Sequence, residues 1–349
     1  MSTHSRTELD SKDSRRRLLD RWLAEQLPGR AWHAEPIPSD AGFRRYFRLH
    51  LDPVKGGDAG LLAEGTVIAV DAPPEHENSA AFVAVARLFV EAGLTAPHVY
   101  ASDLEQGLLL VSDLGGRSYR DALCAGPAEP LMEAAIEALI RWQCASAPGV
   151  LPPYDAALLQ RELGLFRQWY LNRHLGRTLS HAEDRALAAV EQALVDAALA
   201  QPRVFVHRDF MPRNLMVCPT GPGILDFQDA VYGPIAYDVL SLLRDAFLSW
   251  PQASIERWLA SYHARARLAG LPVGELEQFR QWFDWIGVQR HLKVIGIFAR
   301  LWYRDGKPAY FADVPRFLSY LEAEVGPYRQ LAPLAELLGL GGASGANRS

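Results

Sequence analysis

Residues 204–230, VFVHRDFMPRNLMVCPTGPGILDFQDA, combine short apolar runs with groups of polar residues. The runs Val204–Val206 and Leu215–Val217 predict two buried strands that hold a polar loop between them. Gly221–Gly223 then predicts a turn that reverses the chain, so that Asp226, at the end of a third apolar run, faces the loop. The stretch therefore requires a fold that brings Asp226 and the loop together.

The polar residues of this stretch suit phosphoryl transfer. That reaction needs a carboxylate to orient the attacking hydroxyl and oxygen ligands to hold Mg²⁺ on the phosphates. Asp209 is the predicted catalytic base, and Asn214 and Asp226 are the predicted Mg²⁺ ligands. His207 is interpreted as a packed, hydrogen-bonded residue rather than a proton carrier. The alternative is a chance polar turn, but the combined spacing H-x-D-x4-N with a later Asp-Phe favours the functional interpretation.

The chain before Arg117 carries mostly strand patterns, bounded by glycine, proline and serine. Apolar residues at helical spacing occur there only twice. The predicted elements are, in order, a helix over 15–27, strands on both sides of a turn at Ser39–Gly42, a strand at Gly65–Pro74, a helix from an N-cap at Ser79 to Gly93, and two strands within 97–116.

From Arg117 on, helical patterns dominate, and short strands interrupt them only around residues 204–227. This order predicts the α+β class, with a small antiparallel sheet lobe followed by a larger, mainly helical lobe. A length of 349 residues is compatible with two such domains. We expect a nucleotide-binding lobe over 1–114, a second lobe over 115–338 and a disordered tail over 339–349.

Composition argues against several classes of protein. The net charge is −5 and no Lys/Arg cluster is interleaved with aromatic residues, which argues against a nucleic-acid partner. No apolar run reaches the ~18 residues of a membrane helix, and the polar start is unlike a secretory signal. Cys124, Cys144 and Cys218 lack the spacing of a zinc site or a disulfide framework. We expect a cytoplasmic enzyme with no membrane contact and no obligate protein partner.

The polar stretch also carries a family resemblance. His207–Asn214 and Asp226–Phe227 resemble the catalytic loop and the metal segment of the aminoglycoside phosphotransferase and choline kinase group. LLLVSDLGG (108–116) resembles their hinge, and YGPIAYDVLSLLRDA (232–246) resembles the segment that follows the metal site. The resemblance implies a protein-kinase-like two-lobe fold with ATP and Mg²⁺ as cofactors. Asp238, in the last segment, is expected to tie the catalytic loop to the next helix.

Further segments narrow the resemblance. SDAGFRRYFRL, VDAPPEHENSAAFVAVARLF, DLEQGLLLVSDLG and, above all, GVQRHLKVIGIFARLWYRDGKPAYFADVPRFLSYL are similar to the anomeric sugar kinases of bacterial cell-wall recycling. Those enzymes phosphorylate the C1 hydroxyl of N-acetylmuramate and N-acetylglucosamine, for UDP-sugar synthesis. The resemblance therefore implies an amino-sugar acceptor. Two alternatives stay open: a kinase of another acceptor (an aminoglycoside, choline or homoserine), and a pseudokinase that binds a nucleotide or a sugar.

Two departures from the family pattern concern the nucleotide site. The turn at 39–42 has a single glycine, so the phosphates would meet its backbone amides rather than a glycine-rich loop. The strand that should carry an ATP-binding lysine reads TVIAVDAPP, and arginines of the preceding strand (Arg44, Arg45 and Arg48) are the cations that could replace it. The expected nucleotide-binding residues are Ser39, Asp40, Ala41, Gly42, Arg44, Arg45 and, at the hinge, Ser112, Asp113 and Leu114.

The helix predicted around residues 282–300 is the candidate acceptor site. At about 100° per residue, one of its faces collects two tryptophans, an amide, a glycine and two cations. Aromatic faces pack on sugar rings, Gln289 suits hydroxyl or acetamido groups, and Lys293 or Arg300 could pair with the carboxylate of N-acetylmuramate. The expected substrate-binding residues are Trp282, Trp285, Gln289, Lys293, Arg300 and, beside the reacting residues, Arg213 and Asp229.

Alternatives remain for this face. Its two cations could be solvated or tied to Asp305 and Asp313. A cationic face argues against a polycationic aminoglycoside, although acidic residues near Glu162 or Asp155 could still bind one. His291 lies on the opposite, apolar side of the helix and is expected in the core.

Overall fold

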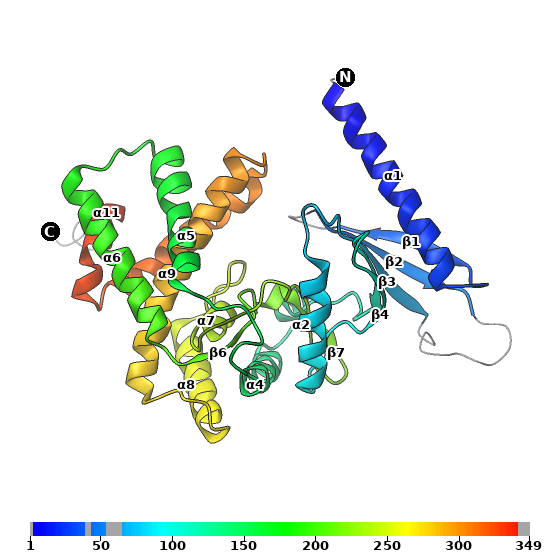
Figure 1. The fold of residues 1–349 in the computed structure, drawn as a ribbon. Coiled ribbons are helices and arrows are strands. Elements are labelled where there is room, and N and C mark those ends of the chain that lie inside the picture. The colour runs from blue at the N-terminus through cyan, green and yellow to red at the C-terminus, as the bar shows by residue number, and fades with distance from the viewer. Residues whose placement is uncertain (1–2, 39–42, 54–64, 341–349) are drawn as a thin grey trace. The chain divides into compact units, whose positions relative to one another are not determined.

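The computed structural model describes residues 3–38, 43–53 and 65–340, and for residues 3–13 only the backbone. Contacts divide the chain into two units (Figure 1). The first unit spans residues 1–117 and 216–228, and the second spans 118–215 and 229–349. The chain leaves the first unit after residue 117, close to the boundary expected after residue 114. Residues 216–228 belong to the first unit again. From residue 341 on, the predicted tail lies outside the described residues.

The first unit is built on a five-stranded sheet in which every pairing is antiparallel. Its strands are β1 (Trp32–Ile37), β2 (Arg45–Leu51), β3 (Thr66–Asp71), β4 (Val99–Asp103) and β5 (Leu108–Ser112). They lie in the order β1-β2-β3-β5-β4, so the central β3 is buried along nearly its whole length. The strands predicted for this part of the chain are confirmed.

The C-terminal half of helix α1 (Thr3–Gln26) packs on one face of this sheet (Figure 1). Leu19 and Leu23 of the helix are buried in one apolar cluster with Leu49 of β2 and Leu110 of β5. The helix side contributes residues three or four apart and the strand side contributes alternate residues, as the two periods require. The helix predicted over 15–27 is confirmed, and it begins before the apolar pattern does.

Helix α2 (Ser79–Glu91) does not have the predicted N-cap. Asn78, rather than Ser79, accepts a hydrogen bond from the backbone N–H of Ala81 at 3.0 Å, and Ser79 is the first helical residue. Asparagine and serine cap helices about equally well, so sequence alone did not separate these neighbours. Gly93 follows the helix with φ +71°, the left-handed conformation in which many helices end, as predicted.

Residues 216–228 include most of a two-stranded hairpin, β7 (Leu215–Cys218) and β8 (Gly221–Ile224). The predicted turn at Gly221–Gly223 is wrong, because Pro219–Thr220 already reverse the chain and the glycines belong to β8. The backbone N–H of Ile224 donates to the carbonyl of Thr95 at 2.8 Å. This bond attaches the hairpin, and the Asp226 that follows it, to the first unit.

The second unit is mainly helical, and its longest helix, α9 (Leu276–Tyr303), lies among most of the others (Figure 1). The other helices are α3 (Tyr119–Ala125), α4 (Glu129–Cys144), α5 (Ala156–Leu165), the π-helix η1 (Phe166–His174), α6 (His181–Leu199), the 3-10 helix η2 (Pro212–Asn214), α7 (Tyr237–Leu243), α8 (Gln252–Leu268), η3 (Pro308–Asp313), α10 (Val314–Val325), η4 (Arg329–Leu331) and α11 (Ala332–Leu338). Strands β6 (Arg203–Val206) and β9 (Val231–Pro234) pair antiparallel beside them. Over the residues that the structure describes, no helix is both long and apolar enough to cross a membrane.

Candidate active site

The loop after β6 carries the predicted base. The backbone N–H of Asp209 donates to Nδ1 of His207 at 3.2 Å, and the Nδ2 of Asn214 donates to the carbonyl of Asp209 at 2.9 Å. His207 is buried, which confirms its interpretation as a packed, hydrogen-bonded residue. The loop thus closes on itself and holds the Asp209 backbone at both of its polar groups.

Asp238 anchors the same loop from α7. Its carboxylate accepts the backbone N–H of His207 at 2.6 Å and that of Arg208 at 3.0 Å. Burial raises the pKa of Asp238 to about 7, although these two N–H groups act in the opposite direction. The predicted tie between the catalytic loop and the next helix is confirmed.

Two residues at or beside the predicted site have a strained backbone conformation. Among the described residues other than glycine, only Arg208 (φ 77°) and Asp226 (φ 62°) adopt the left-handed conformation. Such residues cost about 1–3 kcal/mol each and cluster at functional sites, because surrounding contacts must hold them in place. The two predicted chemical groups, Asp209 and Asp226, therefore lie at or beside positions where the fold imposes a conformation.

Glu162 of α5 is the partner that holds Arg208. Its carboxylate accepts hydrogen bonds from Arg208, from Tyr154 and from Nε2 of Gln289, the last at 3.0 Å, and it lies 3.0 Å from Nζ of Lys293. Glu162 is only 4% exposed. Glu162, near which acidic residues could still have bound a polycationic acceptor, is thus enclosed by two cations of the protein itself.

The charges of this cluster stabilise one another. Burial by itself would raise the pKa of Glu162, but the attraction of Lys293 and Arg208 outweighs it and holds the pKa at about 2. Burial would likewise lower the pKa of Lys293, yet the Tyr237 oxygen and Glu162, followed by Asp209, keep it above the usual value. Lys293 therefore stays charged, and it lies close enough to Asp209 for that carboxylate to raise its pKa.

A sequence signal for Glu162 existed. Leu159, Leu163 and Phe166 follow helical spacing and are buried, and Glu162 lies on the same stripe. A carboxylate on an apolar stripe has to find a cation, because an isolated buried charge is very unfavourable. Helical patterns were expected over this part of the chain, but the position of Glu162 on the buried stripe was not predicted.

In the first unit, Asp226 follows β8 and its environment is partly aromatic. The Nε2 of Gln228 donates to Oδ1 of Asp226 at 2.9 Å. The next residue, Phe227, is buried, with its ring centroid 4.9 Å from that of Phe82 and 5.3 Å from that of Phe89. Phe82 and Phe89 lie on one face of α2, two turns apart, and their packing against Phe227 fixes the Asp-Phe segment.

The arginines of the first unit have different partners. The Nε of Arg44 lies 3.1 Å from a carboxylate oxygen of Glu77. Burial raises the pKa of Tyr46. The charge of Arg44 lowers this pKa and the carboxylate of Asp226 raises it, so both charges act on the same hydroxyl. Arg44 and Asp226 therefore both lie within electrostatic reach of Tyr46.

The other two arginines pair elsewhere in the sheet. Arg45 binds the buried carboxylate of Asp71, which also binds Arg15. Arg48 lies 2.6 Å from Asp113. Both cations are thus used in holding neighbouring elements of the first unit together.

The remaining predicted nucleotide residues divide into two groups. Ser39–Gly42 lie outside the described residues. At the hinge, the Ser112 hydroxyl accepts the backbone N–H of His98 at 2.9 Å, Asp113 accepts Arg48, and the Leu114 carbonyl is 3.5 Å from the Cys218 thiol. The hinge side chains are therefore held by the sheet and the hairpin.

The predicted acceptor face of α9 is divided between two environments. Gln289 and Lys293 meet Glu162, as described above. Trp282 and Trp285 instead line a small cavity of about 200 Å³ together with Ala197 of α6 and Ala200, which follows that helix. The structure therefore does not bring these tryptophans together with the two cations of the face, because α9 passes different neighbours along its length.

The other predicted acceptor residues have protein partners. The guanidinium of Arg213 lies over the ring of Phe247, 4.9 Å from its centroid, and the Asp229 carbonyl accepts Arg208 at 3.4 Å. Asp155 caps α5, because its side chain accepts the backbone N–H of Leu158 at 2.8 Å.

His291 is fully buried, which confirms its place in the core, and its Nδ1 lies 2.9 Å from Glu324.

Comparison with known proteins identifies the family. The model of the phosphotransferase enzyme family matches residues 33–286. The chain belongs to this family. The expected kinase-like fold and the expected enzyme class, a phosphotransferase, are thereby confirmed.

Relatives within the phosphotransferase family match nearly the whole chain. A protein of Pseudomonas putida named N-acetylmuramate/N-acetylglucosamine kinase is 48% identical over 337 residues, which cover 93% of this chain and 96% of that protein. A protein of the same name from Pseudomonas aeruginosa is 49% identical over 94% of this chain and 97% of its own. The resemblance expected from the sequence is confirmed.

Solved structures of similar fold extend to distant phosphotransferases. The choline kinase of Streptococcus pneumoniae has a TM-score of 0.59 at 11% identity, over 88% of this chain and 99% of that one. An aminoglycoside phosphotransferase with bound ADP has a TM-score of 0.54 at 13% identity, over 86% of this chain and 96% of that one. At these identities the likeness concerns the fold alone.

Proposed function

We propose that this chain is an ATP-dependent kinase of the anomeric C1 hydroxyl of N-acetylmuramate and N-acetylglucosamine. The observation that carries the proposal is the near full-length similarity to relatives named N-acetylmuramate/N-acetylglucosamine kinase. Another relative of this name, from Neisseria meningitidis, is 42% identical. The products are the two sugar 1-phosphates, formed in the cytoplasm. The muramyl product then feeds UDP-N-acetylmuramate synthesis in peptidoglycan recycling.

Asp209 is the proposed base. It accepts the proton of the C1 hydroxyl while that oxygen bonds to the γ-phosphorus, and the bond to the β,γ-bridging oxygen breaks as ADP leaves. The support is positional: Asn214 and Asp238 hold the loop backbone on both sides of Asp209. A base has to be held within hydrogen-bond reach of the proton that it removes, and these bonds limit its movement.

Asn214 and Asp226 are the proposed Mg²⁺ ligands, and their chemistry fits that ion. Both residues supply oxygen, and the bond from Asn214 Nδ2 to the Asp209 carbonyl defines which end of the amide carries the oxygen. Mg²⁺ uses one or two protein carboxylate or amide oxygens and completes its shell with water and phosphate. When bound, it neutralises negative charge on the phosphates.

Arg44 is the proposed replacement for the ATP-binding lysine. Its pairing with Glu77, immediately before α2, supplies a cation held by a carboxylate at the start of that helix. Tyr46 links it electrostatically to Asp226. An arginine also presents several donors to phosphate oxygens, where a lysine presents a point charge.

Turnover with defined acceptors tests the proposal. Purified protein with ATP and Mg²⁺ is incubated with N-acetylmuramate, N-acetylglucosamine, an aminoglycoside, choline or homoserine, and products are followed by phosphorus NMR. An anomeric phosphate from both amino sugars is expected. Phosphate only on another acceptor, or nucleotide binding without turnover, would refute the proposal.

A variant separates the chemistry from binding. Asp209→Asn should lower kcat by at least ~10²-fold while ATP binding stays intact, because it removes proton acceptance and keeps the side-chain shape. Asp196→Asn, an exposed site on α6, is the matched control and should leave kcat unchanged. Wild-type turnover by Asp209→Asn would show that another group is the base.

A further inference from the structure

Arg208, the residue directly before the proposed base, has an unusual backbone conformation. Its φ of 77° lies in the left-handed region, which is unfavourable for every residue that has a Cβ. The backbone N–H of Arg208 donates to Asp238, and this bond fixes the peptide unit that precedes the residue. Because φ and ψ are the only soft backbone dihedrals of a residue, those of Arg208 set the direction in which the chain enters Asp209.

The side chain of Arg208 is held by residues from other elements. Its guanidinium donates to the Glu162 carboxylate of α5 and lies over the ring of Tyr154, 5.7 Å from the ring centroid. Arg208 is thus attached at two points, to α7 through its backbone and to α5 through its side chain. Rotation about the N–Cα bond moves the side chain and the following chain together. A relaxation to negative φ would therefore carry the guanidinium away from Glu162.

Glu162 is itself fixed, so it cannot follow a moving guanidinium. The Tyr154 hydroxyl and Nε2 of Gln289 donate to one of its carboxylate oxygens, the latter at 3.0 Å. Nζ of Lys293 lies 3.0 Å from the other oxygen, which also accepts the guanidinium. The same ammonium donates to the Tyr237 hydroxyl, at the start of α7, at 3.1 Å. The two points that hold the loop are therefore joined to each other through α9.

Two of the residues expected to bind the acceptor therefore have partners inside the protein. Gln289 and Lys293 are buried, and both meet Glu162. Arg300 lies about two turns further along α9, where its buried Nε forms no hydrogen bond with any described residue. The contacts of Gln289 and Lys293 thus lead to the catalytic loop through Glu162, and those of Arg300 do not.

We propose that Arg208 is a positioning residue for the base. Its ion pair with Glu162 holds residue 208 in the left-handed conformation that directs the Asp209 carboxylate at the acceptor hydroxyl. Lys293 and Gln289 contribute by keeping Glu162 in place. The inference rests on the proposed function, because it takes Asp209 as the base.

Steady-state kinetics with N-acetylglucosamine tests the role of the side chain. Arg208→Gln should lower kcat about 10- to 100-fold, because a misdirected base is poorly aligned with the hydroxyl. KM for the sugar and for ATP should change less than ~3-fold, since the lost contact is not one with a bound substrate. Arg208→Lys keeps the charge without the forked geometry and should recover part of kcat.

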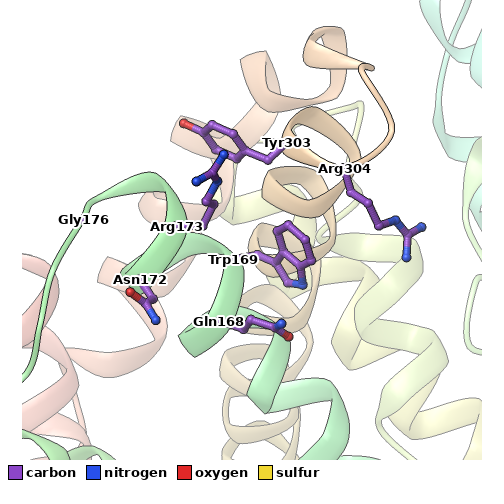
Figure 2. A pocket seen from close by; sticks show the side chains of 7 residues that line it. All are labelled: Gln168, Trp169, Asn172, Arg173, Gly176, Tyr303 and Arg304. Atoms are coloured by element: carbon purple, nitrogen blue, oxygen red, sulfur yellow. The ribbon is translucent and has the colours of Figure 1, made fainter.

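The matched control is Arg173→Gln. The Arg173 guanidinium lies over the Tyr303 ring, 5.3 Å from its centroid, beside a cavity of about 840 Å³ (Figure 2). Arg173 and Arg208 therefore both lie over a tyrosine ring, but over the described residues only Arg208 has a carboxylate partner. Arg173→Gln should leave kcat unchanged.

Glycine and alanine at position 208 separate the backbone conformation from the charge. Both variants lack the guanidinium, but glycine adopts positive φ without a steric penalty and alanine does not. Arg208→Gly should therefore retain roughly 10-fold more kcat than Arg208→Ala. Equal kcat in these two variants would overturn the proposal that the ion pair works through the backbone of residue 208.

A double variant tests whether Arg208 works through Glu162. Arg208→Gln combined with Glu162→Gln should have about the same kcat as Glu162→Gln alone, because the second change breaks a pair that is already lost. Losses that multiply would show independent roles and overturn the proposal. A wild-type kcat in Arg208→Gln would overturn it as well.

Phosphorylation of neither sugar by the unaltered protein would refute the proposed function, and hydrogen exchange would then decide the positioning role. The backbone N–H groups of His207 and Arg208, both bonded to Asp238, should exchange at least ~10-fold faster in Arg208→Gln. The amides of α6 should keep their wild-type rates, which separates a local change from a general loss of stability. Unchanged exchange at both loop amides, or the same acceleration throughout α6, would show that the side chain does not position the loop.

Discussion

Replacing Glu162 with glutamine is expected to destabilise the second unit. The change keeps the shape of the side chain and removes its charge, so that Arg208 and Lys293 stay buried beside a neutral amide. The pKa of Glu162 is about 2 rather than its usual 4.5, a difference equivalent to about 3 kcal/mol in favour of the carboxylate. Removing one partner of a buried ion pair costs about 3–5 kcal/mol, which agrees in size.

The same pKa predicts how the effect depends on pH. Because the folded protein depresses the pKa of Glu162, its stabilisation is fully present above the unfolded pKa of about 4.5 and is lost as the pH falls towards 2. The free-energy difference between wild type and Glu162→Gln should therefore be about 3 kcal/mol at pH 7 and should shrink below about pH 4.5. Urea unfolding followed by circular dichroism measures both.

The control is Glu191→Gln, which removes the carboxylate of the partly exposed pair with Arg167 and should cost at most about 1 kcal/mol. Glu162→Gln should also lower kcat about 10- to 100-fold, because Arg208 precedes Asp209 and a displaced base loses its alignment with the substrate. A loss of stability below about 1 kcal/mol at pH 7, or one that stays constant with pH, would show that Glu162 does not hold these charges.

Three further changes test other contacts. Arg44→Gln should raise KM for ATP about 10-fold, because one charge-assisted contact to phosphate is lost. The control, Arg87→Gln on the exposed side of α2, should leave KM for ATP unchanged. Equal KM values in the two variants would exclude Arg44 as a phosphate ligand. Gly296→Ala should lower the free energy of unfolding by about 1–3 kcal/mol, because the added Cβ meets the backbone of α5. The control is Gly164→Ala, which has open space around it. Unchanged stability in Gly296→Ala would mean that α9 can move away from α5 to make room for the methyl group. Lys293→Met should reduce kcat/KM for both amino sugars to the same extent, because its charge is directed at Glu162; a selective loss for N-acetylmuramate would contradict this.

The sequence predicted the elements whose pattern is local. The alternation of β2, the end of α2 at Gly93 and the polar loop after β6 each depend on residues a few positions apart. Errors arose where two neighbouring solutions were locally equivalent. Asn78 and Ser79 both cap helices well, and Pro219–Thr220 reverses the chain just before the glycines that were taken for the turn.

Contacts between residues far apart in the chain could not be predicted from the sequence, for a physical reason. A buried charge needs a counter-charge, but packing decides which one. Glu162 and Gln289 are 127 positions apart and meet because α5 lies against α9. The same packing divides the face of α9 that sequence periodicity had treated as one surface, so that Trp282 and Lys293 lie in different environments.

By itself, the sequence determined the class of reaction. Asp209, Asn214 and Asp226 lie within one short segment, and the chemistry of phosphoryl transfer constrains their types and spacing enough to be recognised there. Only the tertiary structure decided which of the predicted acceptor cations already have a counter-charge in the protein. Lys293 is neutralised by Glu162 and Arg300 is not, and that distinction depends on which side chains the packing of α5, η1 and α9 brings within a few ångströms.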